Sequence, residues 1–121
     1  MMARLSKAAI LDAVDLKTEE VDVPEWGGSV VVREFTAADR DAFFAASIRI
    51  KPDGTREPVL DGMNVKLVAA CLVDEAGDLM FTSADIAALA RKSATALERV
   101  ALVASRLNKL AASDVEDVAK N

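Results

Sequence analysis

The fold of this 121-residue chain is decided by residues 21–35, which read VDVPEWGGSVVVREF. Residues 17–23 alternate in polarity, with Val21 and Val23 on one face, as expected for a half-buried strand. Pro24 ends that strand, the two glycines allow a tight turn, and residues 29–35 are β-branched and apolar enough for a second strand. A loop this short allows only antiparallel pairing, so the pattern predicts a β-hairpin at about residues 17–35.

The facing of the second strand stays open. One orientation places Val30 and Val32 inward, and the other places Val31 and Phe35 inward; a strand covered on both sides would satisfy both. Trp26 at the turn has two interpretations as well, a core residue folded back on the sheet or a contact anchor at the hairpin tip. An isolated two-stranded ribbon is only marginally stable, so helices or another subunit must cover it.

The rest of the chain is predicted to be helical. Ser, Thr and acidic residues at cap spacing precede apolar residues that recur at three- and four-residue steps. Two prolines and two glycines between residues 51 and 62 predict a loop, the best candidate for a mobile segment. Helices are expected at 6–14 (a small docking helix), 36–48, 63–73 (the core helix), 82–90, 93–110 and 113–118.

The fold class that follows is α+β and mostly α-helical, with the hairpin at about 17–35 followed by a bundle of about four to five helices in residues 36–121. A chain of this length suits one domain, residues 1–121, with one core. Aromatic residues are only 4% while hydrophobic residues reach 52%, so aliphatic side chains must build that core.

Charge argues against two classes of partner. Twenty acidic and fifteen basic residues give a net charge of -5, which repels nucleic-acid phosphates and anionic membranes, and no basic cluster offsets it. We therefore expect no nucleic acid and no membrane among the partners. No secretion signal is recognised at the N-terminus, and a reducing cytoplasm fits the single cysteine.

The inventory of reactive side chains is nearly empty. The chain has no histidine and no tyrosine, and Cys71 lies in an apolar run where a free cysteine behaves as a buried hydrophobe. Asp39 is explained as a helix-start residue and Asp74 with Glu75 as a turn, at spacings that match no calcium loop. We expect no catalytic residue, no cofactor and no metal site, hence a protein that is not an enzyme.

Several segments resemble the tail assembly chaperones of long-tailed bacteriophages and prophages. The resemblance begins with residues 15–28 and continues through 32–34 and 36–41. Later pieces follow in the same order: 72–75 with Gly77, the region of Phe81 and Asp85, 92–94, 97–100, Ala104 and 106–108. It covers essentially the whole chain but carries no catalytic signature.

The resemblance implies a protein of the bacterial host cytoplasm that coats the tape-measure protein, keeps it soluble and helps to recruit tail-tube subunits. Such a protein is absent from the finished virion. The expected partners are therefore the tape-measure protein, the tail-tube protein and further copies of this chain, which associate through the hairpin. The extended loop at 51–61 departs from the family pattern, so the resemblance assigns it no partner-binding role.

Four residues are the candidates for partner binding: Trp26, Arg33, Phe35 and Phe43. Phe43 and Phe44 point about 100° apart on their helix, so one of them can face a partner while the alternative places both in the core. The terminal Lys120-Asn121 suggests an adenine-rich slippery codon run and a longer frameshifted product, as is common in the family. The competing function is a small acidic helical regulatory or nucleic-acid-binding domain that uses residues 83–110 as a helix-turn-helix.

Overall fold

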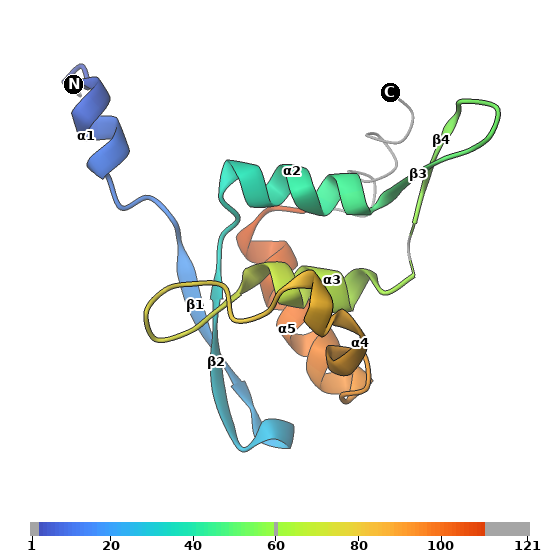
Figure 1. The fold of residues 1–121 in the computed structure, drawn as a ribbon. Coiled ribbons are helices and arrows are strands. Elements are labelled where there is room, and N and C mark those ends of the chain that lie inside the picture. Colours follow the sequence, from blue (N-terminus) through green and yellow to red (C-terminus); the bar gives the residue numbers. More distant parts are fainter. Residues whose placement is uncertain (1–2, 60, 111–121) are drawn as a thin grey trace.

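The structure is a computed structural model, and it describes residues 3–59 and 61–110. The helix expected at 113–118 lies outside these residues. In chain order (Figure 1) the elements are α1 (Lys7–Asp12), β1 (Thr18–Val23), the 3₁₀ turn η1 (Pro24–Trp26), β2 (Gly28–Arg33), α2 (Ala37–Ala46), β3 (Ile48–Ile50), β4 (Arg56–Pro58), α3 (Met63–Cys71), β5 (Leu72–Val73), η2 (Ser83–Asp85), α4 (Ile86–Leu89) and α5 (Ala94–Leu107).

The expected hairpin is confirmed. β1 and β2 pair antiparallel along their whole length, from Thr18 opposite Arg33 to Val23 opposite Gly28. Pro24 starts the 3₁₀ turn between them, and Gly27 closes it with a φ of +76°, a backbone conformation that favours glycine. The local turn chemistry therefore sets the register of the sheet.

A third strand extends this sheet. β5 pairs antiparallel with β2, with Val32 opposite Leu72, so the strand order is β1-β2-β5 and β1 is an edge strand. Val32 is fully buried while Val30 and Val31 are partly covered. The central strand is thus covered on both sides, which reconciles the two orientations that the sequence left open.

The core lies between the sheet and the helices α3 and α5, which cross one behind the other in Figure 1. Ser93 caps α5 by accepting a hydrogen bond from the Ala96 amide, and the helix turns one apolar face inward. α3 is buried on several sides, as expected for the core helix. The residues that these two helices bury are Leu67, Val68, Ala69, Cys71, Ala96, Leu97, Val100, Ala101 and Ala104.

The expectation of a plain helical bundle after the hairpin is wrong. Residues 48–58 form a second antiparallel hairpin, β3 with β4, which projects from the body in Figure 1; β4 lies in the loop expected at 51–62, and β3 begins at the end of the expected helix 36–48. The C-terminal end of the expected helix 63–73 is the strand β5 instead, because Leu72 and Val73 complete the ladder of β2. The architecture is a mixture of short sheets and helices around one hydrophobic cluster.

The start of α2 follows the capping prediction only in part. The Thr36 hydroxyl accepts a hydrogen bond from the Asp39 amide at 3.0 Å, as expected. The Asp39 carboxylate forms an ion pair with Arg33 at 3.0 Å instead of turning back to the cap. At η2, by contrast, Thr82 and Asp85 form the complete reciprocal capping box.

Asn108 joins the C-terminal end of α5 to the end of the hairpin. Its Oδ1 atom accepts a hydrogen bond from the Phe35 amide at 2.8 Å, and its Nδ2 atom donates to the Ala104 carbonyl at 2.9 Å. Asn108 is 5% exposed and Phe35 is 6% exposed. The contact therefore satisfies a backbone N–H that burial has removed from water.

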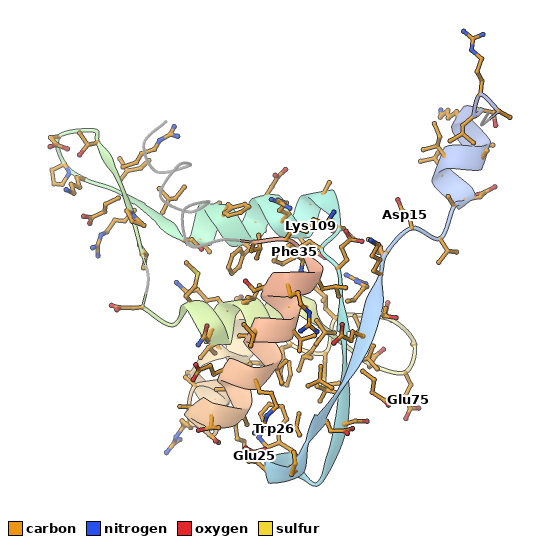
Figure 2. The ribbon with its side chains drawn as sticks, turned by 180° about the vertical axis from the view of Figure 1, so that it is seen from behind. Asp15, Glu25, Trp26, Phe35, Glu75 and Lys109 are labelled. Carbon is orange, nitrogen blue, oxygen red and sulfur yellow. The ribbon has the colours of Figure 1, made fainter. Side chains whose placement is uncertain are left out.

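α1 stands apart from the rest of the fold. Ser6 caps it through the Ala9 amide, but none of its residues is buried (Figures 1 and 2). The sequence predicted a docking helix here, but α1 buries no residue against the described part of the chain. In the described part of the chain, the helices are too short or too polar for any of them to cross a membrane.

Candidate partner-binding surface

Trp26 sits at the tip of the hairpin, which an ion pair between Glu25 and Arg99 joins to α5. The neighbouring Glu25 carboxylate accepts two hydrogen bonds from the Arg99 guanidinium, at 2.6 and 2.9 Å (Figure 2 shows Glu25 beside Trp26). This bidentate pair lowers the pKa of Glu25 to about 2 and raises that of Arg99. Trp26 is half-buried and packs against the core cluster, and its role as a contact anchor stays a prediction.

One face of Trp26 lines a shallow cavity of about 430 Å³, which we call the Trp26 hollow. Phe81, Ala88 and Leu89 supply the other apolar lining. Glu25, Asp85 and Lys92 stand around its rim. A large aromatic side chain in a concave apolar site with charges at the margin is a common arrangement in protein-binding surfaces.

A second cavity, of about 490 Å³, runs between α2 and α3, and we call it the α2–α3 groove. Its lining includes four small side chains, Ala42, Ala46, Ala69 and Ala70. Asp39 and Lys66 are its charged margins. The apolar lining is Ala42, Phe43, Ala46, Ala69, Ala70, Leu79, Phe81 and Ile86, and Phe81 also lines the Trp26 hollow.

Arg33, a predicted contact residue, is turned inward. Its guanidinium donates to the Asp39 carboxylate and to the Gly77 carbonyl, each at 3.0 Å, and its side chain is 15% exposed. The Nε atom is buried and has no hydrogen-bond partner within the described residues. Arg33 therefore fastens the turn after β5 to the start of α2, beside one margin of the groove.

Phe35 and Phe43, which the sequence offered as partner contacts, lie in the core. Each is 6% exposed, and their ring centroids lie 5.4 Å apart. Phe44, the alternative to Phe43, is half-buried, and the Arg40 guanidinium lies 5.3 Å from its ring centroid. Phe43 reaches the surface only as part of the wall of the α2–α3 groove.

The thiol and carboxylate groups considered as catalytic or metal-binding candidates have structural roles. Burial raises the pKa of the Cys71 thiol to about 12, so the thiol stays protonated and unreactive. The Asp74 carboxylate accepts hydrogen bonds from the amides of Ala76 and Asp78 and holds a turn. Across residues 3–59 and 61–110, no three acidic or cysteine side chains come together in a way that could hold a metal ion.

The basic residues of α5 are also occupied. Arg99 binds Glu25, and Arg106 forms an ion pair with Glu19 of β1 at 2.6 Å. Both arginines thus face carboxylates of the hairpin, which leaves them poorly placed to contact phosphates. This arrangement speaks against a recognition helix for nucleic acid in residues 83–110.

Two comparisons with known proteins assign the chain to a family. A family model described as "Phage tail assembly chaperone" matches residues 5–121. The chain belongs to the phage tail assembly chaperone family. The fold of this tail assembly chaperone is similar to a solved structure, "Structure of bacteriophage HK97 tail assembly chaperone", with a TM-score of 0.57 and 20% sequence identity. The match covers 87% of this chain and 93% of that chain.

None of the functionally curated proteins matches this tail assembly chaperone. The family assignment confirms the resemblance seen in the sequence, and it names a chaperone class and no enzyme class. The two cavities were missed by sequence reasoning, because their linings come from separate segments. The local signals were Trp26 for the hollow and, for the groove, the pair Ala42 and Ala46, one turn apart and exposed on α2.

Proposed function

We propose that this chain binds the tape-measure protein through the Trp26 hollow and keeps it soluble in the bacterial cytoplasm until the tail is assembled. The observation that carries the proposal is a concave apolar site built around the only tryptophan, on a member of a tail assembly chaperone family. A long helical client would place the apolar stripe of one helix against such a site and leave its polar face in water.

The margins of the hollow suit a client of mixed charge. Glu25 and Asp85 offer carboxylates, and Lys92 offers an ammonium group on the same rim. Glu25 keeps its negative charge well below neutral pH because Arg99 binds it. Apolar side chains of the client would enter beside Trp26, while its Lys, Arg and acidic residues would meet these rim charges.

Chaperoning of a long client requires many copies along it. Each copy would cover one apolar stretch, and contacts between neighbouring copies would raise the effective concentration for the next binding event. The coated tape-measure protein would then recruit tail-tube subunits, whose assembly displaces the chaperone, so that the finished virion lacks it. Reversible burial of apolar surface is the only chemistry that this cycle needs.

Co-expression with the tape-measure protein of the same phage tests the proposal. Ala88→Arg places a long charged side chain in the Trp26 hollow without removing core volume, because Ala88 is exposed. We expect the wild-type chain to raise the soluble fraction of the tape-measure protein severalfold and Ala88→Arg to abolish that gain. Ala87→Arg is the matched control, because Ala87 is an exposed alanine of the same helix α4 but lines neither the hollow nor the groove.

Two results would contradict the proposal. The wild-type chain could leave the tape-measure protein as insoluble as it is alone, which would remove the chaperone role. Ala88→Arg could instead solubilise the client as well as Ala87→Arg does, which would remove the hollow from the binding surface. Circular dichroism and the thermal midpoint of each variant establish that it folds.

A further inference from the structure

β1 is the edge strand of the three-stranded sheet, and in the described part of the chain no strand pairs with its outer side. The Lys17 carbonyl accepts from the Glu34 amide, so the odd-numbered residues of β1 bond to β2. Backbone groups alternate between the two sides of such a strand, so the N–H and C=O groups of Thr18, Glu20 and Asp22 point to the open edge. A further strand can add to the sheet there.

The outer face of β1 is acidic. Glu20 and Asp22 are exposed on the face opposite to the buried Val21 and Val23. Neither carboxylate belongs to any of the ion pairs formed among the described residues. Antiparallel pairing of two copies of β1 would therefore bring carboxylates opposite carboxylates, which is destabilising. The edge favours a strand whose side chains on this face are basic.

β3 and the residue that follows it have this pattern. Their side chains alternate between Ile48 and Ile50 on one face and Arg49 and Lys51 on the other. Arg49 and Lys51 share one carboxylate, that of Glu57, at 2.6 and 3.4 Å, so two cations meet one anion and the pair keeps a positive charge. β3 and β1 lie on opposite sides of the body in Figure 1, so β3 reaches this edge only in another copy.

The open side of β3 decides the orientation. The Lys51 amide donates to the Thr55 carbonyl, so the odd-numbered residues bond toward β4 and the even-numbered ones, Ile50 among them, bond outward. In an antiparallel pair, outward-bonding residues stand opposite each other on one face, which would set Ile50 against a carboxylate of β1. In a parallel pair, each stands opposite a residue that bonds away from it, which sets Arg49 opposite Glu20. Parallel pairing is the orientation that matches opposite charges.

We propose that β3 of one copy adds to β1 of the next copy as a parallel strand, with Arg49 opposite Glu20 and Lys51 opposite Asp22. The two strands belong to different surfaces of the chain, so the contact is heterologous and can repeat from copy to copy. This inference gives the self-association in the proposed function a specific interface, and it rests on that function only for its biological role.

The register uses every outward-pointing main-chain group of β3. Its two outward amides donate to the carbonyls of Thr18 and Glu20, and its two outward carbonyls accept from the amides of Glu20 and Asp22. The residue after Lys51 is Pro52, which has no N–H, so the ladder ends there.

The apolar side of the added strand meets α5. Arg99 and Arg106 of α5 each bind a carboxylate of the hairpin. Leu102 lies three residues after the first arginine and four before the second, so it shares their side of the helix, and it is 66% exposed. Ile50 is 70% exposed in its own chain. Ile48 and Ile50 of an added strand turn toward the α5 side of the sheet, where Leu102 offers them apolar surface.

Charge reversal tests the proposal, by light scattering coupled to size-exclusion chromatography on the full chain without client. One variant carries Glu20→Lys with Asp22→Lys, and the other carries Arg49→Glu with Lys51→Glu; all these positions are exposed. Each variant alone places like charges on both strands, so we expect it to associate at least tenfold more weakly than the wild type. A one-to-one mixture should restore association, because reversed β1 meets reversed β3 and native β1 meets native β3.

Glu75→Lys with Asp78→Lys is the matched control for the acidic strand. It changes the net charge by the same amount, at two exposed positions of the turn after β5, and it should associate like the wild type. Circular dichroism and the thermal midpoint of each variant establish that it folds.

Disulfide formation tests the orientation. We expect a chain with Glu20→Cys to cross-link to a chain with Arg49→Cys under mild oxidation, because parallel pairing sets these positions opposite each other on one face. A chain with Ile50→Cys is the control, since position 50 stands opposite position 20 only in an antiparallel pair. Cys71 is buried and does not take part.

Other arrangements give different results, and each overturns the proposal. A monomeric wild-type chain would show that the edge takes no second copy. Association that survives both charge reversals, or a mixture that stays dissociated, would show that other surfaces join the copies. Cross-linking of Glu20→Cys to Ile50→Cys, or to itself, would show a different strand pairing.

The two proposals can fail independently. Association in these experiments is measured without the tape-measure protein, whereas client binding is measured through Ala88→Arg in the Trp26 hollow. A chain that associates as expected but solubilises no client would contradict only the proposed function. A chain that solubilises the client but ignores both charge reversals would contradict only the strand pairing.

Discussion

Replacement of Asn108 by Ala removes the side chain that joins α5 to the end of the hairpin. The Phe35 amide, 2.8 Å from Oδ1, would lose its acceptor inside the core. The Ala104 carbonyl would still accept from the backbone N–H of residue 108, at 3.1 Å, and the Cys71 sulfur would lose only a weak contact at 3.6 Å, so the main cost comes from the Phe35 amide. A buried donor left without a partner costs about 1–3 kcal/mol, so we expect a destabilisation of about 2 kcal/mol.

Urea denaturation at one fixed protein concentration measures this loss. The slope m should not change, while the midpoint falls in proportion to the lost free energy, and about 2 kcal/mol corresponds to a thermal midpoint lower by about 8 °C. Asn64→Ala is the matched control, because Asn64 is exposed on α3 and its loss should change stability by less than about 0.5 kcal/mol. An Asn108→Ala chain as stable as the Asn64→Ala chain would refute the role of this contact.

Three further predictions concern the core, the hairpin tip and the thiol. Phe43→Ala, at a 6% exposed ring against Phe35, should cost about 3–5 kcal/mol in chemical denaturation, and half-buried Phe44→Ala clearly less; equal losses would contradict the packing. The pKa of Glu25 is about 2 in the folded chain and 4.5 in the unfolded chain. The stabilising contribution of Glu25 is therefore complete above about pH 4.5 and is lost as the pH falls toward 2. The urea midpoints at pH 7 and pH 3 should differ less in Glu25→Gln than in the wild type. Cys71 should resist a thiol reagent at pH 8 in the folded chain and react at once in urea, and rapid native labelling would contradict its burial.

The parts of the fold that sequence predicts are those with a local cause. Pro24 and Gly27 define the hairpin turn, and the side chains of Thr36 and Ser93 mark helix starts, because each acts on a backbone group within a few residues. The family was recognisable for a different reason, since its pattern extends over nearly the whole chain.

The parts that sequence missed depend on distant segments. Leu72 and Val73 continue an apolar helical run, and only the neighbouring β2 makes them a strand. Arg33 competes with the Thr36 cap for the Asp39 carboxylate, which a local rule cannot weigh. The β3–β4 hairpin was hidden because its strands are short and one contains Pro58, a composition that predicts a loop.

The candidate site shows the same division. Trp26 was identified because a lone tryptophan at a turn is conspicuous, and the structure places it in an apolar hollow. Phe35 and Phe43 were equally conspicuous but belong to the core, since the packing of α2 against the hairpin end decides their burial. The cavities form because Phe81 lies close to residues of the hairpin, α2 and α4, and no periodicity in the sequence predicts such long-range contacts.

The fluorescence of Trp26 tests the central claim most directly. The chain has a single tryptophan, so titration with a purified tape-measure fragment that lacks tryptophan reports on the hollow alone. The account predicts a saturable blue shift of the emission in the wild-type chain and none in Ala88→Arg. An unchanged spectrum in the presence of a fragment that demonstrably binds the chain would contradict the assignment of the Trp26 hollow as the client-binding site.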